Sequence, residues 1–267
     1  MKVGTLALST LESFLHNRIV VLVLILGLCI VILMMISVWG TRAAASVSNH
    51  QAMEGMVLET VSFAMSFMSF LGSILAAWGA ADAVHSEIKS GTVLAVMARP
   101  VKRWEFLLGK YVGVMLFMLC YVLLMMAMTY SVVSFAGMSV HASPWILLVY
   151  PVVRYAIWAG LALALTTLVH PVVTMGMLFV ISLLSDFVAP GSMSWIPKLH
   201  WLKTGLYYLL PSTNLLTEGR FLSLRQASIK QAGWAQHAVS LGYGLDCALI
   251  LVLLAMWSFH YRSLRQD

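Results

Sequence analysis

Charge is what this sequence has least of. Only 10% of its 267 residues are Asp, Glu, Lys or Arg, whereas 61% are hydrophobic. About a quarter of the residues of a soluble domain are charged, and so few charges do not cover a water-exposed surface. The composition therefore excludes a soluble enzyme, a nucleic-acid-binding domain and a disordered protein. It predicts a single membrane domain over residues 1–267.

Cysteines and catalytic motifs are also scarce. Cys29, Cys120 and Cys247 lie in apolar runs, so we expect core residues and neither a disulfide nor a metal site. The eight histidines include no pair four residues apart, and Gly109-Lys110 lacks the rest of a phosphate-binding loop. We therefore expect no catalytic residue, metal or cofactor in this chain, and any ATP that drives it is hydrolysed by another polypeptide.

Six apolar runs stand out, and about 20 apolar residues in a helix cross the hydrocarbon core of a bilayer. The sequence predicts an all-α fold with transmembrane helices at about 19–39, 61–81, 111–136, 145–169, 172–189 and 238–259. Pro171 sets the start of the fifth span, because proline ends the preceding helix. Residues 190–237 then form a long extracytoplasmic loop between spans five and six.

Basic residues are denser on one side of this predicted topology. Six spans place both termini on the same side as residues 82–110, and that side holds nine Lys and Arg in 57 positions. The opposite side holds six in 77. Because cytoplasmic connections carry the excess of Lys and Arg, we expect both termini and residues 82–110 in the cytoplasm.

The residues before the first span show helical periodicity. The residues that recur on one helical face, all apolar except Thr10, are Val3, Leu6, Ala7, Thr10, Leu11, Phe14 and Leu15. Polar residues occupy the other face, which predicts an amphipathic helix on the cytoplasmic surface of the membrane. Two interpretations are open: a surface anchor, or a lever that links a cytoplasmic partner to the first span.

Residues 82–110, which we call the elbow, carry most of the motifs. We expect a short helix, a break at Gly91, and a second short helix from about Thr92 that stops at Pro100. Arg103 then lies at the membrane edge. The pattern predicts a compact, charged and folded connection.

The elbow contains the order Glu…Ser-Gly-Thr…Arg-Pro-Val-Lys-Arg…Leu-Gly-Lys between spans two and three. This order resembles the ABC-2 type permeases, which are membrane subunits of ATP-binding-cassette transporters. The run 206–214, with Tyr-Tyr-Leu-Leu-Pro, resembles one branch of that family, which includes the permease of the nitrous-oxide-reductase maturation system.

The resemblance implies that the elbow docks on a separate ATPase subunit and transmits its movement. The implied coupling residues are Glu87, Gly91, Thr92, Arg99, Pro100 and Arg103. Gly91 would let the backbone turn, and the two arginines would pair with carboxylates of the ATPase. The family further implies a bacterial inner-membrane exporter in which this chain and a second copy, or a homologous permease, work with an ATPase dimer that binds ATP and Mg.

Three ionisable residues interrupt the apolar spans. At helical rise, Arg154 lies about 14 Å and Asp246 about 12 Å below the outer ends of their spans, and Asp186 is near the outer end of span five. Intramembrane charges are costly and usually paired. We expect an Arg154–Asp246 pair with Asp186 as a weaker partner, serving either to lock helices or to line a substrate path.

Two other functions remain open at this stage. The chain could be a mechanotransmitting subunit that moves no substrate and acts on an extracytoplasmic partner through residues 190–237. It could also be an ion-driven secondary carrier, for which Arg154 and the two acids are the only candidate site.

Overall fold

The computed structural model describes residues 2–45, 50–89, 102–135, 144–188 and 234–261, together with Pro211 and Leu216. Every element in these ranges is a helix, as predicted. The helices are α1 (Lys2–Leu15), α2 (Arg18–Ala45), α3 (His50–Lys89), α5 (Arg103–Phe135), α6 (Pro144–Thr166), α7 (Pro171–Val188) and α10 (Trp234–Tyr261).

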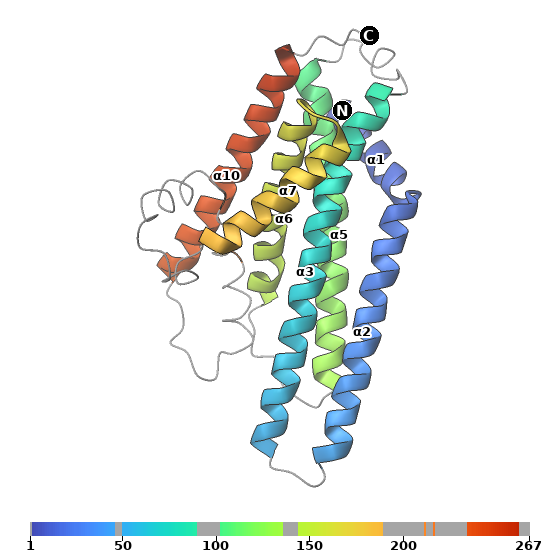
Figure 1. The fold of residues 1–267 in the computed structure, drawn as a ribbon, viewed down its shortest axis with the longest axis vertical. Coiled ribbons are helices and arrows are strands. Elements are labelled where there is room, and N and C mark those ends of the chain that lie inside the picture. Colours follow the sequence, from blue (N-terminus) through green and yellow to red (C-terminus); the bar gives the residue numbers. More distant parts are fainter. Residues whose placement is uncertain are drawn as a thin grey trace.

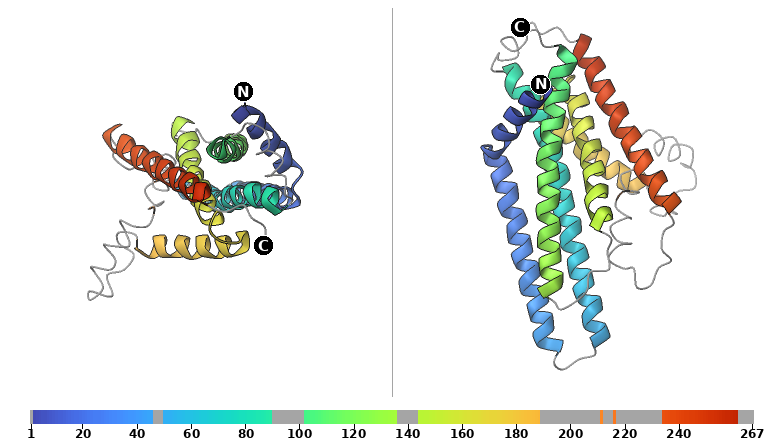
Figure 2. Two further views of the ribbon diagram at one scale, coloured as in Figure 1. Left: turned by 90° about the horizontal axis from the view of Figure 1, so that it is seen from above. Right: turned by 180° about the vertical axis from the view of Figure 1, so that it is seen from behind.

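Five helices in the described ranges are long and apolar enough to cross a membrane. These spans are Arg18–Thr41, Gly55–Glu87, Trp104–Phe135, Trp145–Thr166 and His237–Phe259. They correspond to predicted spans one to four and six, and they make this chain a multi-pass membrane protein. In α7 the apolar stretch Pro171–Ser185 is shorter, and α7 lies obliquely to the bundle (Figure 2). A sixth crossing therefore stays a prediction.

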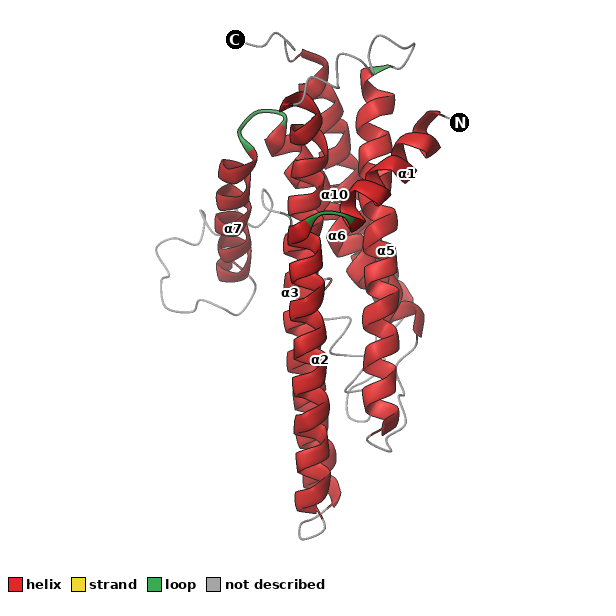
Figure 3. Ribbon diagram, turned by 90° about the vertical axis from the view of Figure 1, so that its right-hand side faces the viewer, coloured by secondary structure: helices red, strands yellow, loops and turns green. Residues whose placement is uncertain are grey.

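The bundle is built around α3. This helix packs against α2, α5 and α6, and α10 packs on the far side of α6. The long helices α2, α3 and α5 run side by side (Figure 1). Helix α1 crosses the side of α5 (Figure 3). We call the end of the bundle that holds α1 and the last turn of α10 the α1 end. The far end means the opposite ends of the helices, and those of α6 and α10 lie well short of the opposite ends of α2 and α3 (Figure 1).

Helix α3 is much longer than the predicted span 61–81. Its 40 residues reach about 60 Å at helical rise, and most of the predicted connection 40–60 belongs to α2 and α3. Hydropathy detects only the part of a helix that suits lipid, so it does not report where the helix itself ends.

The first half of the elbow is also different from the prediction. Residues 82–89 are the last turns of α3 rather than a separate short helix, and α5 begins at Arg103. No helix breaker occurs between Asp82 and Lys89, so the helix continues as it leaves the apolar region. The second predicted helix, near residues 92–100, lies outside the described residues.

The turn between α6 and α7 explains the role of Pro171. Helix α6 ends at Thr166 rather than near residue 169, and Pro171 is the first residue of α7. Proline suits this position because its missing N–H has no intrahelical acceptor there. His170 precedes it and accepts hydrogen bonds from the Val172 N–H through Nδ1 (3.4 Å) and from the Thr174 N–H through its carbonyl oxygen (3.0 Å).

Small residues on α3 allow close packing inside this chain. Ala76 and Ala80 are fully buried, and a Cβ on Gly72 would overlap the Tyr155 hydroxyl of α6. The Tyr121 hydroxyl of α5 donates to the Met68 carbonyl of α3 at 2.8 Å. Gly72, Ala76 and Ala80 are four residues apart and form one face of α3. This face of small residues therefore allows close contacts among α3, α5 and α6.

Candidate functional site

Helix α1 is seated in a recess that two glycines leave open. The Phe14 ring is buried and occupies the space where a side chain on Gly79 of α3 would stand. The same ring lies 5.4 Å from the Phe117 ring of α5, measured between centroids. One helical turn earlier, a Cβ on Gly113 of α5 would lie 2.7 Å from the Thr10 Cβ. Helix α1 thus fits α3 and α5 through close steric contacts.

The predicted amphipathic helix is present as α1, and its position on the cytoplasmic membrane surface stays a prediction. The buried part of its apolar face, including Ala7 and Phe14, packs against protein. Leu8 and Leu15 remain exposed. Helix α1 packs mainly along α5, so a lever at this position would act most directly on span three.

The turn between α1 and α2 is tied to α3 through Asn17. Its Oδ1 accepts the Ile19 N–H at 3.0 Å, which caps the start of α2. Its Nδ2 donates to Asp82 Oδ2 at 3.0 Å. A single side chain therefore fixes the helix start and joins it to the last turns of α3, which form the first part of the predicted elbow.

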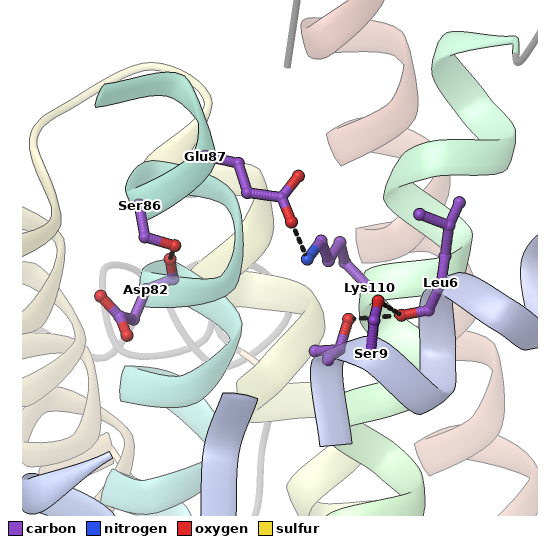
Figure 4. A network of polar contacts seen from close by, with 7 residues as sticks. Leu6, Ser9, Asp82, Ser86, Glu87 and Lys110 are labelled. Atoms are coloured by element: carbon purple, nitrogen blue, oxygen red, sulfur yellow. Dashed lines mark hydrogen bonds and ion pairs between the residues drawn. The ribbon is translucent and has the colours of Figure 1, made fainter. Parts of the chain in front are cut away.

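An ion pair joins the two ends of the elbow. Lys110 of α5 donates to Glu87 Oε1 of α3 (Figure 4). The lysine is only 4% exposed, and its ammonium nitrogen lies 5.8 Å from the centroid of the Phe106 ring. A buried ammonium is costly without a partner, so Glu87 is the residue that makes this position tolerable.

A polar cleft of about 490 Å³ lies between α1 and the ends of α3 and α5. Figure 4 shows Asp82, Ser86 and Glu87 of α3 on one side of this region, with Lys110 of α5 and Ser9 of α1 on the other. The cleft is lined by Ser9, Thr10, Glu12, Ser13, Phe14, His16, Asn17, Asp82, Ala83, Ser86, Glu87 and Lys110. It therefore joins the N-terminal helix and both arms of the elbow in one site.

Only one of the six expected coupling residues, Glu87, is seen in this site. Arg103 is the first residue of α5, and its side chain lies outside the described part of the chain. Gly91, Thr92, Arg99 and Pro100 also lie outside the described residues.

Sequence reasoning did not include Asn17, Asp82 and Lys110 in this site. Asn17 had a recognisable signal, because Asn directly before an apolar run is a typical helix cap. Asp82 and Lys110 mark the edges of spans, but nothing in the linear sequence pairs either one with its partner.

The intramembrane charges lie on neighbouring helices. Arg154 is partly buried on α6, and Asp246 is exposed on α10, which packs against α6. Asp186 belongs to α7, with its side chain outside the described residues. The Arg154–Asp246 pair stays a prediction. Among the residues that the structure describes, no group of three or more His, Cys, Asp or Glu side chains is placed to hold a metal ion.

Part of the segment between α7 and α10 enters the bundle near these charges. Leu216 is 1% exposed and packs with Val153 of α6. A Cβ on Gly244 of α10 would lie 3.4 Å from Leu216 Cδ1. The Ser185 hydroxyl of α7 donates to the Pro211 carbonyl at 3.3 Å. Leu216 therefore contacts α6 and α10, and Pro211 contacts α7.

Aromatic contacts join α6 and α10 at the far end. The Trp145 and Trp234 rings stack with centroids 5.5 Å apart and an interplanar angle of 6°. The Tyr150 hydroxyl forms a 2.7 Å hydrogen bond with His237 Nδ1. Trp and Tyr favour the boundary between lipid and water, so this cluster suits a membrane interface.

The helical bundle and its apolar outer faces define a multi-pass membrane protein, with a polar cleft at one end of the bundle. The model of the ABC-2 family transporter proteins matches residues 12–264. The chain therefore belongs to the ABC-2 family of membrane transporter proteins, and it is a permease component that associates with an ATPase subunit in a transporter. No curated protein matches the chain.

Proposed function

We propose that this chain is the permease subunit of an exporter and that a separate cassette ATPase drives it through the elbow and α1. The observation that carries the proposal is the joint between α1, the end of α3 and the start of α5. Phe14 fills the space beside Gly79, Asn17 donates a hydrogen bond to Asp82, and Lys110 forms an ion pair with Glu87. A displacement of the elbow at this joint would move α1, α3 and α5 together.

The proposed mechanism assigns ATP and Mg to the ATPase dimer. Arg99 and Arg103 would meet carboxylates on the ATPase, Thr92 and Pro100 would shape the docking segment, and Gly91 would provide its turn. The Glu87–Lys110 pair would then pass the movement to spans two and three. In this arrangement the chain lies in a bacterial inner membrane and its α1 end faces the cytoplasm. Two permease copies enclose the export path.

A second candidate is a mechanotransmitting subunit that moves no substrate itself. The observation in its favour is the position of Leu216, which packs between α6 and α10. In addition, the Pro211 carbonyl accepts a hydrogen bond from Ser185 of α7. Movement of these helices would be carried into residues 190–237, where an extracytoplasmic partner would respond.

The elbow provides the direct test. The full chain is co-expressed with its ATPase and reconstituted, and ATP hydrolysis is compared with that of the ATPase alone. We expect Gly91→Pro and Glu87→Ala to abolish stimulation of the ATPase while the chain still inserts in the membrane. Gly91→Ala is the matched control, because it keeps more backbone freedom than proline.

Normal stimulation by Gly91→Pro would overturn the role of the elbow. Failure of any cassette ATPase to purify with the unmodified chain would overturn the proposed function itself. If coupling is normal but reconstituted vesicles export nothing, whereas an extracytoplasmic protein is captured, the mechanotransmitting function is correct.

A further inference from the structure

The cleft at the α1 end is built from three helices that meet only in the folded protein. Helix α1 contributes Glu12, α3 contributes Asp82 and Glu87, and α5 contributes Lys110. Its volume of about 490 Å³ is within the range of sites that bind small ligands. A group held here touches α1 and both arms of the elbow at once.

The charges that line the cleft do not balance. Three carboxylates, those of Glu12, Asp82 and Glu87, face one ammonium, that of Lys110. Lys110 is already paired with Glu87. Apart from this pair, the described lining holds two acidic side chains, Glu12 and Asp82, which come from different helices, and no further Lys or Arg.

Most hydrogen-bond donors of the lining are already used. Three of its four hydroxyls donate within their own helices: Ser9 to the Leu6 carbonyl (2.9 Å), Thr10 to the same carbonyl (2.7 Å) and Ser86 to the Asp82 carbonyl (2.7 Å). Each of these hydroxyl oxygens retains acceptor capacity. The hydroxyl oxygens therefore favour a ligand that donates hydrogen bonds.

The Asn17 amide and the His16 imidazole also use a hydrogen-bond donor within the protein. Asn17 donates to Asp82 Oδ2 at 3.0 Å. The His16 ring lies with Nδ1 3.0 Å from the Glu12 carbonyl oxygen, and because a carbonyl only accepts, Nδ1 carries the proton. Its Nε2 is then an acceptor in the neutral ring. A phosphate or carboxylate ligand would meet acceptors and negative charge, so the cleft does not suit an anion.

We propose that the cleft receives a basic side chain, Arg or Lys, from the ATPase subunit, an inference that rests on the proposed function. A guanidinium offers five donors and a permanent charge, which match the surplus acceptors around Glu12 and Asp82. Docking then uses two contacts of opposite polarity. Arg99 and Arg103 of the elbow meet acids of the ATPase, and the cleft accepts one of its bases.

Charge variants at Glu12 test this contact, because Glu12 is exposed on α1 and its replacement leaves the core intact. The full chain and the ATPase that purifies with it are measured for affinity in lipid nanodiscs over a range of salt. We expect Glu12→Gln to raise Kd about tenfold, which is about 1.4 kcal/mol. Glu12→Lys raises it further, and both flatten the salt dependence. Glu59→Gln, an exposed acid on α3 nearer the far end, is the matched control with the same charge change.

A photo-crosslinker at Ser13 identifies what enters the cleft. An adduct with an Arg- or Lys-containing peptide of the ATPase is the expected result. Unchanged affinity in Glu12→Gln and Glu12→Lys, with the elbow variants still uncoupled, overturns this inference and leaves the proposed function intact. Stabilisation of the unmodified chain alone by spermidine or Mg²⁺, lost in Glu12→Gln while ATPase affinity is unchanged, makes the cleft a site for a free cation and also overturns it.

Discussion

The two ends of the helical bundle are held together by different kinds of contact. At the α1 end, α1, α3 and α5 are joined by the buried Glu87–Lys110 pair, the Asn17–Asp82 hydrogen bond and the Phe14 ring. At the far end, α6 and α10 are joined by stacked tryptophans and the Tyr150–His237 hydrogen bond. The first set combines charge and steric fit, whereas the second is mainly aromatic.

In the proposed function, the α1 end is the one that the ATPase moves. Its charged and closely fitted contacts have strict geometry, so a displacement of one helix would be passed on to its neighbours. Aromatic pairs also prefer particular geometries, but those at the far end join α6 and α10 and do not involve α1 or α3. We therefore expect changes at the α1 end to affect coupling to the ATPase, and changes at the far end to affect stability without affecting coupling.

The largest effect is expected for Lys110→Met. It leaves the Glu87 carboxylate without its ammonium partner in a largely buried position, at a cost of about 3 kcal/mol. Thermal unfolding should occur at a clearly lower temperature, and stimulation of ATP hydrolysis should be lost. Glu87→Gln combined with Lys110→Met should recover part of the stability.

Lys102→Met is the control for this variant, because Lys102 is an exposed lysine close to the start of α5. Its effect should be within about 0.5 kcal/mol. Equal effects of the two lysine variants would contradict the role assigned to the buried pair.

An intermediate effect is expected for Gly79→Ala. The added methyl group would overlap the Phe14 ring, and such overpacking costs about 1–3 kcal/mol. The ring must move, so α1 should lose its fixed position relative to α3, and ATPase stimulation should fall. Phe14→Leu combined with Gly79→Ala, which replaces the ring with a smaller side chain, should restore part of the coupling. If the double variant is no better than the single one, steric fit is not what links α1 to α3.

The smallest effect is expected for Tyr150→Phe at the far end. It removes one hydrogen bond to His237 and retains the ring, which costs about 1 kcal/mol. Unfolding should occur at a slightly lower temperature, and ATPase stimulation should be unchanged. Tyr150→Leu also removes the aromatic contact and should be less stable than Tyr150→Phe. A loss of stimulation in Tyr150→Phe would show that the two ends do not differ as described.

Much of the fold was predictable, because each span is a local property of the chain. Apolar runs located the cores of five crossing helices, and Pro171 located the start of α7. The ends of helices were not predictable in the same way. Asp82–Lys89 is polar, but it contains no helix breaker, so it continues α3 beyond the apolar region.

The candidate site was only partly predictable. Glu87 was expected from the family resemblance, and the structure places it in the cleft beside Lys110. The partners of Lys110 and Asn17 were not expected, because they are 23 and 65 positions away in the chain. No spacing rule for a single helix applies over such separations.

The sequence alone determined that this chain resides in a membrane, where most of its crossing helices lie, and to which transporter family it belongs. These properties follow from apolar runs and short motifs, which each segment carries by itself. Only the tertiary structure decided that α1 packs against α3 and α5, and that Glu12, Asp82, Glu87 and Lys110 line one cleft. Such contacts depend on how each helix is rotated and shifted against its neighbours, and that is set by the fit of side chains such as Phe14 to spaces such as the one beside Gly79.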